Sequence, residues 1–235
     1  MRISLCNVYS LLVLIMIFIL IYSGSVLANR PLDTKEYTSR ADPIKVKDPQ
    51  ISWVAYTSLT EEDEVDYYQL SVGKGEQIYA SMSIPQLDRL INYDPVIALI
   101  GPQLDDHLSG FNKNDIYELL DIKTGEGVIV KRYEGSNLKK FFEPFTQTKY
   151  WEKQELRVGA PSKGIYYLAV FSLKDQIGKY VFSIGEKEKW GLKDMARFPK
   201  IWWEVRKFME KTISTYVIVV FIGLIIVILV LKIIL

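Results

Sequence analysis

An unbroken apolar run near the C-terminus constrains the fold of this chain more than any other feature. Residues 213–231 contain no charged side chain, and Lys211 and Lys232 stand on either side of them. Nineteen such residues form a helix of about 28 Å, close to the ~30 Å thickness of a hydrocarbon core. We therefore predict a transmembrane helix over residues 213–231, followed by a short tail of residues 232–235. A cleaved lipid-anchor signal, the alternative, needs a polar spacer that Ser214 and Thr215 do not provide.

A second apolar run, near the N-terminus, has the features of a secretory signal. Arg2 precedes it, residues 11–21 are all apolar, and residues 26–28 suit cleavage after an alanine. Eleven residues span only about 16 Å as a helix, which is short for a bilayer. We predict a signal peptide over residues 1–28, with an uncleaved N-terminal anchor as the alternative. Cleavage would remove Cys6, the single cysteine, so we expect no disulfide in the mature chain.

The segment before the predicted span is basic. Residues 192–212 hold six basic and three acidic side chains, a bias that by itself would place this side in the cytoplasm. Long exported domains translocate largely regardless of charge, so the signal peptide decides the orientation. We expect a single-pass protein of the cell membrane whose N-terminal domain lies outside the cytoplasm. A basic juxtamembrane helix over residues 187–212 would contact membrane lipid through five interface residues: Trp202, Trp203, Arg206, Lys207 and Lys211.

The helical pattern extends into the span without an obvious break. Pro199 suits the first turn of a helix, where no backbone donor is needed. No proline follows it, so we predict one continuous helix from Pro199 to the end of the chain. The alternative is a bend within residues 212–215, where serine and threonine can loosen the turn.

Between the two apolar ends the sequence is typical of β-structure. Short runs rich in β-branched and aromatic residues alternate with Gly, Pro and Asp, and no helical period separates them as a parallel α/β fold would require. The predicted strands cover residues 51–58, 67–72, 77–84, 96–100, 128–133, 150–158, 165–172 and 179–184. We predict an all-β fold: an antiparallel, jelly-roll-like sandwich of about eight strands over residues 51–186.

The sequence also indicates a central strand, two turns and an N-terminal tether. Residues 165–172 are apolar on both faces, as expected of a central strand. Compact turns at residues 73–75 and 173–178 join neighbouring strands, and one helical turn is expected near residues 115–120. Residues 29–50 contain three prolines and mixed charges, so we predict a tether there.

Short motifs between residues 64 and 185 follow one another in a recognisable order. They lie at residues 66–76, 94–99, 164–170 and 178–182. They resemble the opening strand, the Asp-Pro-Val strand and the closing glycine-aromatic pair of bacterial and archaeal pre-peptidase C-terminal (PPC) modules. The resemblance implies a jelly-roll-like accessory module that serves secretion, adhesion or substrate contact and not catalysis. Residues 143–146 and 187–206 also resemble an uncharacterised group of membrane-anchored prokaryotic proteins.

Side chains suited to catalysis are scarce. The chain has one histidine and one cysteine and lacks the motifs of common hydrolases and nucleotide-binding enzymes. Asp105, Asp106 and His107 form the sharpest polar cluster, which suits calcium or a transition metal. A solvated turn is the alternative interpretation. We predict no catalytic residues and no cofactor, with calcium at this loop as the alternative.

Aromatic side chains gather near the end of the predicted domain. Exposed rings on a β-sandwich can stack on sugars or anchor a partner protein, and buried rings would instead close the end of the sandwich. The candidates for ligand binding are Phe141, Phe142, Phe145, Tyr150 and Trp151.

The charge balance bears on the class of partner. The chain has 29 basic and 28 acidic residues, which argues against nucleic acid. We predict a non-enzymatic, membrane-anchored binding or assembly module whose ligand is a membrane or surface protein, or a glycan. Two alternatives are a transport adaptor resembling GOLD-domain cargo receptors and a metal-dependent hydrolase centred on the Asp105 loop.

Overall fold

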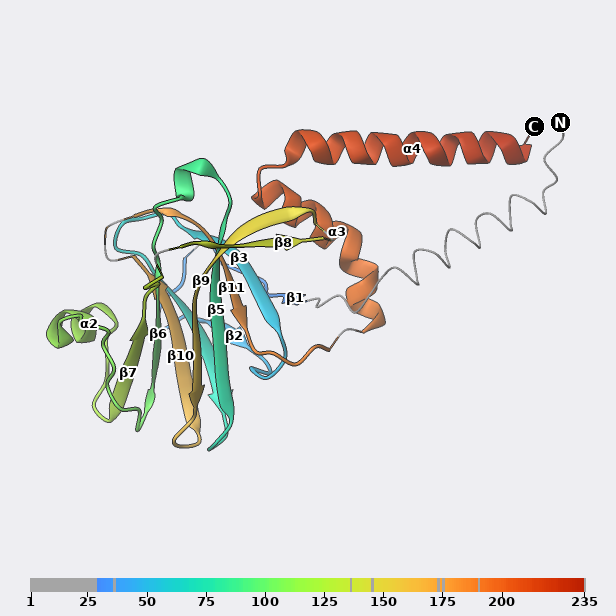
Figure 1. The fold of residues 1–235 in the computed structure, drawn as a ribbon. Coiled ribbons are helices and arrows are strands. Elements are labelled where there is room, and N and C mark those ends of the chain that lie inside the picture. Colours follow the sequence, from blue (N-terminus) through green and yellow to red (C-terminus); the bar gives the residue numbers. More distant parts are fainter. Residues whose placement is uncertain are drawn as a thin grey trace. The chain divides into compact units, whose positions relative to one another are not determined.

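The computed structural model describes residues 29–35, 37–135, 137–144, 146–172, 174, 176–189 and 191–234, so the predicted signal peptide lies outside the described residues. The chain forms two units (Figure 1), of which one is Asn29–Met209 and the other includes Glu210–Leu235. The described residues contain four helical segments: the 3-10 turn η1 (Asp88–Leu90), α2 (Lys113–Leu119), α3 (Leu192–Phe208) and α4 (Thr212–Ile234). The described residues form eleven strands: β1 (Arg30–Pro31), β2 (Ile44–Val46), β3 (Trp53–Leu59), β4 (Val65–Val72), β5 (Gln77–Pro85), β6 (Val96–Pro102), β7 (Glu126–Lys131), β8 (Lys139–Glu143), β9 (Thr148–Gly159), β10 (Gly164–Phe171) and β11 (Gly178–Ile184).

The first unit is a sandwich of two mixed sheets. One sheet has the order β1-β3-β11-β5-β9-β8 and the other the order β2-β4-β10-β6-β7. Most neighbours are antiparallel, whereas β1 pairs with β3 and β2 pairs with β4 in parallel. The prediction of a β-sandwich is confirmed. Its sheets are mixed and not entirely antiparallel, because the N-terminal segment adds a parallel edge strand to each sheet.

Three apolar clusters hold this unit together. The largest lies between the sheets and includes Tyr68, Leu168 and Phe182, all fully buried. Helix α2 packs its Ile116 on the outer face of the five-stranded sheet. Helix α3 packs Val205 on the outer face of the six-stranded sheet. Each sheet therefore buries much of both faces, which explains the apolar character of β10 on its two sides, as predicted for a central strand.

The predicted tether belongs to the sandwich. Residues 29–50 form β1 and β2, and Ile44 and Val46 are buried in the central cluster. The guanidinium of Arg40 binds the carboxylate of Glu126 and lies 4.9 Å from the ring centroid of Tyr167. The tether prediction is wrong because this segment pairs with both sheets, buries apolar side chains in the core and makes ion pairs through some of its charged residues.

The eight predicted strands are all present within a few residues of the predicted bounds, and the helical turn near residue 115 is α2. The turn at residues 73–75 follows β4, which lies in one sheet, and leads to β5 in the other. Likewise β10 and β11 lie in different sheets, so the last two strands do not form a hydrogen-bonded pair. The predicted turns therefore cross from sheet to sheet. The jelly-roll connectivity stays a prediction.

Two helices replace the single one predicted. Helix α3 begins at Leu192, seven residues before Pro199, and ends at Phe208. Its first turn is closed by Asp194, whose Oδ2 accepts from the backbone N–H of Gly191 at 2.9 Å. Glu210 has a φ of 59°, a left-handed conformation that a continuous helix does not contain. The break therefore lies at residues 209–211, before the predicted bend at residues 212–215.

The second unit contains α4. Residues Thr212–Lys232 are long and apolar enough to cross a membrane, with a mean hydropathy of 3.1 in the most apolar stretch. The prediction of one C-terminal helix that could span a bilayer is thereby confirmed at the level of length and composition.

Candidate functional site

The polar loop at residues 105–107 is engaged in local structure. Asp106 accepts from Lys113 Nζ at 2.6 Å, from the Tyr117 hydroxyl at 2.9 Å and from the Val128 N–H at 3.1 Å. Partial burial works to raise the pKa of Asp106, but these hydrogen bonds together hold it below its usual value. His107 pairs through its backbone with Ile129 of β7. The cluster thus fastens the loop to α2 and β7.

No assembled metal site emerges at this loop. Among the residues that the structure describes, no group of three or more His, Cys, Asp or Glu side chains is arranged to hold a metal ion. Asp105, Asp106 and His107 are neighbours in sequence, and the oxygens of Asp106 already accept three donors. The calcium alternative therefore stays a prediction.

The structure separates the predicted aromatic group into two sets. Tyr150 and Trp151, on β9, are buried, with exposed fractions of 4% and 8%. Phe141 and Phe142, on β8, are exposed at 44% and 51%. Phe145 lies outside the described residues. The two β9 rings are buried, as in the alternative interpretation. Of the four candidate rings that the structure describes, the two on β8 present a surface to a ligand.

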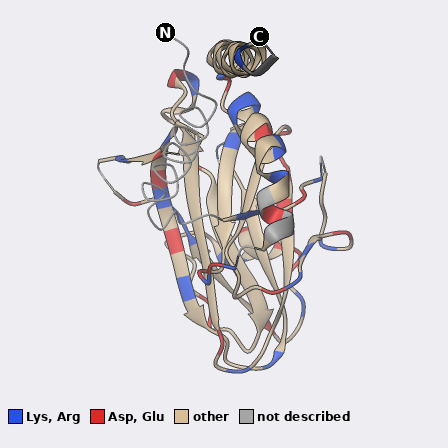
Figure 2. Ribbon diagram, turned by 90° about the vertical axis from the view of Figure 1, so that its right-hand side faces the viewer, with Lys and Arg blue, Asp and Glu red and all other residues tan. Residues whose placement is uncertain are grey.

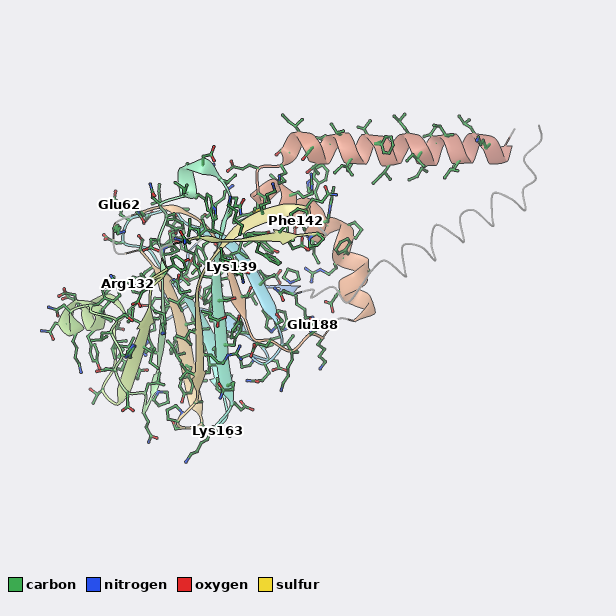
Figure 3. All side chains as sticks on the ribbon, in the orientation of Figure 1. Glu62, Arg132, Lys139, Phe142, Lys163 and Glu188 are labelled. Atoms are coloured by element: carbon green, nitrogen blue, oxygen red, sulfur yellow. The ribbon has the colours of Figure 1, made fainter. Side chains whose placement is uncertain are left out.

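The exposed phenylalanines lie on the last strand of the six-stranded sheet, which we call the β8 edge (Lys139–Glu143; Figure 3). Within the part of the chain that the structure describes, β8 pairs with β9 alone. Phe141 stacks on Tyr150 with ring centroids 6.3 Å apart, and Lys139 Nζ lies 2.5 Å from Glu152 Oε2. Glu143 Oε2 accepts from the Thr146 N–H at 2.7 Å, which fixes the turn into β9. The edge is thus ordered on its inner side and open on its outer side.

The predicted membrane-interface residues do not share one environment. Trp202 and Trp203 are half-buried and Lys207 is exposed, whereas Arg206 is buried in the first unit. Its Nη1 donates to the Thr146 carbonyl at 2.7 Å. The structure therefore corrects the prediction for Arg206, which joins α3 to the β8–β9 turn and does not face a headgroup surface. Lys211 lies in the other unit.

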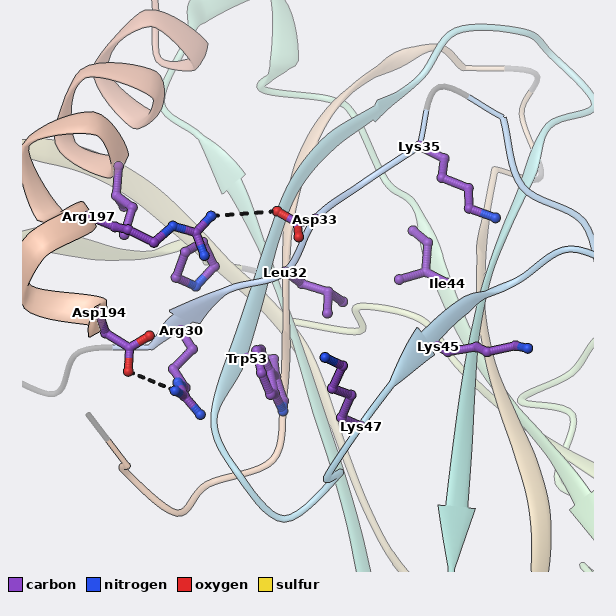
Figure 4. A pocket seen from close by; sticks show the side chains of 12 residues that line it. Arg30, Leu32, Asp33, Lys35, Ile44, Lys45, Lys47, Trp53, Asp194 and Arg197 are labelled. Atoms are coloured by element: carbon purple, nitrogen blue, oxygen red, sulfur yellow. Dashed lines mark hydrogen bonds and ion pairs between the residues drawn. The ribbon is translucent and has the colours of Figure 1, made fainter. Parts of the chain in front are cut away.

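A basic cleft, which the sequence analysis did not find, lies beside β1 and β2 (Figure 4). Its volume is about 300 Å³. Leu32 and Ile44 contribute apolar surface, and Trp53 of β3 stands in the wall between the basic side chains. The charged residues of the lining are five basic and two acidic ones: Arg30, Lys35, Lys45, Lys47, Arg197, Asp33 and Asp194. A neighbouring hollow of about 250 Å³ shares Leu32, Asp33 and Arg197 with it.

Ion pairs inside the cleft leave an excess of positive charge. Arg30 Nη2 lies 2.7 Å from Asp194 Oδ2, and its guanidinium lies 5.3 Å from the centroid of the Trp53 ring. Arg197 Nη2 lies 3.9 Å from Asp33 Oδ1. These contacts use both acidic side chains of the cleft. Figure 2 shows the mixed basic and acidic residues along α3, which supplies one wall.

The sequence contained a signal for part of this cleft. Residues 44–47 read Ile-Lys-Val-Lys, an alternation of period two that predicts a strand with its lysines on one face. This strand signal was not used, because residues 29–50 were interpreted as a tether. The approach of α3 to this edge depends on tertiary packing that no local pattern reveals.

Comparisons with known proteins assign no family. No protein-family model matches the chain, and no curated protein matches it. Among solved structures, the chain is similar to Aeromonas hydrophila PliG, a periplasmic lysozyme inhibitor of g-type lysozyme. The identity is 8%, the TM-score is 0.33, and the match covers 68% of this chain and 96% of that one. At this level the similarity carries no functional argument. The β-sandwich and the apolar C-terminal helix are by themselves compatible with a membrane-anchored binding module.

Proposed function

We propose that this protein is a non-enzymatic, membrane-anchored binding and assembly module of the extracytoplasmic space, which pairs with a second copy of itself through the β8 edge. The observation that carries the proposal is the open outer side of β8, with Phe141 and Phe142 exposed. Unpaired strand edges are templates for pairing with another chain. The resemblance to PPC modules agrees with an accessory, adhesive role.

The charges of β8 favour a strand of the same sequence as the occupant. In an antiparallel pair related by a two-fold axis through Phe141, Lys139 of each copy lies opposite Glu143 of the other. Opposite charges facing each other across two strands are stabilising, and like charges are destabilising. Parallel in-register pairing would place lysine against lysine, so the pattern selects the antiparallel arrangement. Two copies anchored in one membrane would also meet at high effective concentration.

Disulfide cross-linking of the full chain in native membranes tests this proposal. In a Cys6→Ser background, Phe141→Cys places two thiols on the two-fold axis. The Cα atoms of directly opposed residues are about 4.5–5.5 Å apart, within the range that disulfides require. We expect a covalent dimer on mild oxidation.

Lys139→Cys in the same background is the matched control, because that residue is equally part of the exposed edge. Two copies of residue 139 would be displaced by four residues, about 13 Å along the strands, and should not cross-link. Equal cross-linking of both variants, or none of Phe141→Cys, would contradict the proposal.

The GOLD-like adaptor and the metal-dependent hydrolase stay predictions from the sequence.

A further inference from the structure

We infer that the basic cleft is a binding site for a phosphate-bearing ligand. The inference is independent of strand pairing, because the cleft lies beside β1 and β2, on the edge of the six-stranded sheet opposite to β8. The shared chemistry is a phosphate group attached to a small polar body, which either a soluble phosphate ester or a lipid headgroup can present.

Two lysines give one wall of the cleft its positive charge. Lys45 and Lys47 are exposed residues that alternate with the buried Ile44 and Val46. Neither lysine has an ion-pair partner among the residues that the structure describes. Both line the cleft, together with Lys35, whose Nζ lies 2.5 Å from Asp42 Oδ1. Two uncompensated ammonium groups on one wall favour an anion as the occupant.

The opposite wall is preorganised. Asp194 holds the guanidinium of Arg30 over the Trp53 ring, and the indole Nε1 of Trp53 donates to the Asp48 carbonyl at 2.9 Å. An arginine whose orientation is already fixed loses little conformational freedom when it binds an oxyanion. Guanidinium and ammonium groups are also the donors that most often bind phosphate.

Size and charge narrow the class of ligand. A phosphate monoester carries about −1.5 to −2 charges at neutral pH, which matches an excess of cations better than a single carboxylate does. The cleft, at about 300 Å³, is at the lower limit of small-molecule sites. It therefore suits a phosphate with a body of glycerol size, and the faces of Trp53 and Leu32 supply the apolar contact.

Lysine footprinting of the full chain tests the inference residue by residue. The chain is placed in phosphatidylcholine nanodiscs and treated with an amine-acetylating reagent, with millimolar glycerol 3-phosphate or with glycerol. Acetylation of each lysine is then measured by mass spectrometry. We expect glycerol 3-phosphate to slow the labelling of Lys45 and Lys47 by at least about threefold. The reason is that hydrogen bonds from the ammonium groups to a bound oxyanion keep these amines protonated and shielded from the reagent. Lys74 and Lys163 are exposed, do not line the cleft and serve as internal controls.

A second arm distinguishes the source of the phosphate. Nanodiscs in which one-third of the lipid is phosphatidic acid replace the neutral ones, without soluble ligand. Protection of Lys45 and Lys47 by glycerol 3-phosphate supports a soluble ester, and protection only by phosphatidic acid supports a lipid headgroup. Absence of protection in both arms, or equal protection of Lys74 and Lys163, overturns the inference.

A variant provides the final check. Arg30→Gln removes a cation of the cleft without removing either reporter lysine, and we expect it to abolish most of the protection of Lys45 and Lys47. Lys163→Gln removes the same charge far from the cleft and should leave the protection intact. Should Arg30→Gln fail to fold, Lys47→Gln with Lys45 as the reporter replaces it. Unchanged protection in the folded cleft variant would overturn the inference.

Discussion

A buried carboxyl group links the N-terminal segment to the core of the sandwich. Asp66 is 1% exposed, and its Oδ2 accepts from the Tyr180 hydroxyl at 2.5 Å. Its Oδ1 accepts from the hydroxyl of Thr38 at 3.1 Å. Burial raises the pKa of Asp66 to about 6, with a smaller contribution from Glu64, while the hydroxyl donors oppose the shift. This carboxyl in the folded protein therefore changes its charge near pH 6.

Because its pKa is raised on folding, Asp66 makes the folded state less stable as the pH rises. The folded state binds a proton on Asp66 up to about pH 6, whereas in the unfolded chain this carboxyl has its ordinary pKa of 3.8. The free energy of unfolding should therefore fall as the pH rises from about 4 to 6, by about 3 kcal/mol from this group. Asp66→Asn should flatten this part of the profile, as measured by urea unfolding of the full chain in detergent at each pH.

The exposed Asp63 offers a control for that measurement. Asp63→Asn removes a carboxyl from the neighbouring acidic turn without touching the core. The control should keep the slope of the wild-type protein. If Asp66→Asn kept the same slope, Asp66 would not be the titrating group.

At the scale of elements, the sequence pattern predicted the central strands better than the short strands at the sheet edges. The eight predicted strands have strong alternation or continuous apolar runs, and all of them form. The three missed strands are β1, β2 and β8, which are short, lie at the edges of the sheets and each contain a charged residue. Edge strands lack a second neighbour and one buried face, so their sequences carry a weaker apolar signal.

For the candidate site residues, too, the sequence identified the residue types but not which side chains are buried. Phe141 and Phe142 are exposed, and their part in ligand binding stays a prediction, whereas the burial of Tyr150 and Trp151 depends on α3 and the opposite sheet. Sequence patterns report which residues are apolar, and tertiary packing decides which apolar residues are covered. The basic cleft was missed for the same reason, because its two walls are more than 130 residues apart in sequence.

A buried cation adds polar contacts to the apolar packing that holds α3 on the sandwich. Arg206 is 1% exposed, donates to the Thr146 carbonyl and lies 4.9 Å from the centroid of a Trp202 ring. Arg206→Met keeps much of the apolar volume but removes these polar contacts. We expect a loss of about 2–3 kcal/mol in the free energy of unfolding, and faster hydrogen exchange confined to α3 and the β8–β9 turn.

Lys207→Met is the matched control for this prediction. Lys207 is the adjacent basic residue of α3 and is exposed. Its substitution should change stability by less than about 0.5 kcal/mol. Equal effects of the two substitutions would show that Arg206 has no special part in holding the helix.

At the scale of the whole molecule, the two units differ in what stabilises them. The first has three apolar clusters of its own, and α4 is apolar around its circumference, as expected of a helix surrounded by lipid. Truncation before Thr212 should therefore release a folded sandwich from the membrane. Extraction with alkaline carbonate measures the release, and circular dichroism of the released domain measures the retained β-structure.

Removal of residues 233–235 alone is the control for truncation. It leaves Thr212–Lys232, the stretch long enough to cross a bilayer, and the chain should resist carbonate. Release of this shorter truncation, or retention of the chain that lacks α4, would contradict the assignment of α4 as the anchor.

The position of the last two strands governs when the sandwich can form. Strand β10 lies between β4 and β6, and β11 lies between β3 and β5, so each sheet receives a central strand only from the final part of the domain. While residues 164–184 are still being synthesised, β3 and β4 lack the strands that join them to β5 and β6. Long-range pairing of this kind folds slowly. The topology therefore delays folding until nearly the whole domain is available, and an unfolded chain is what passage through a translocation channel would require.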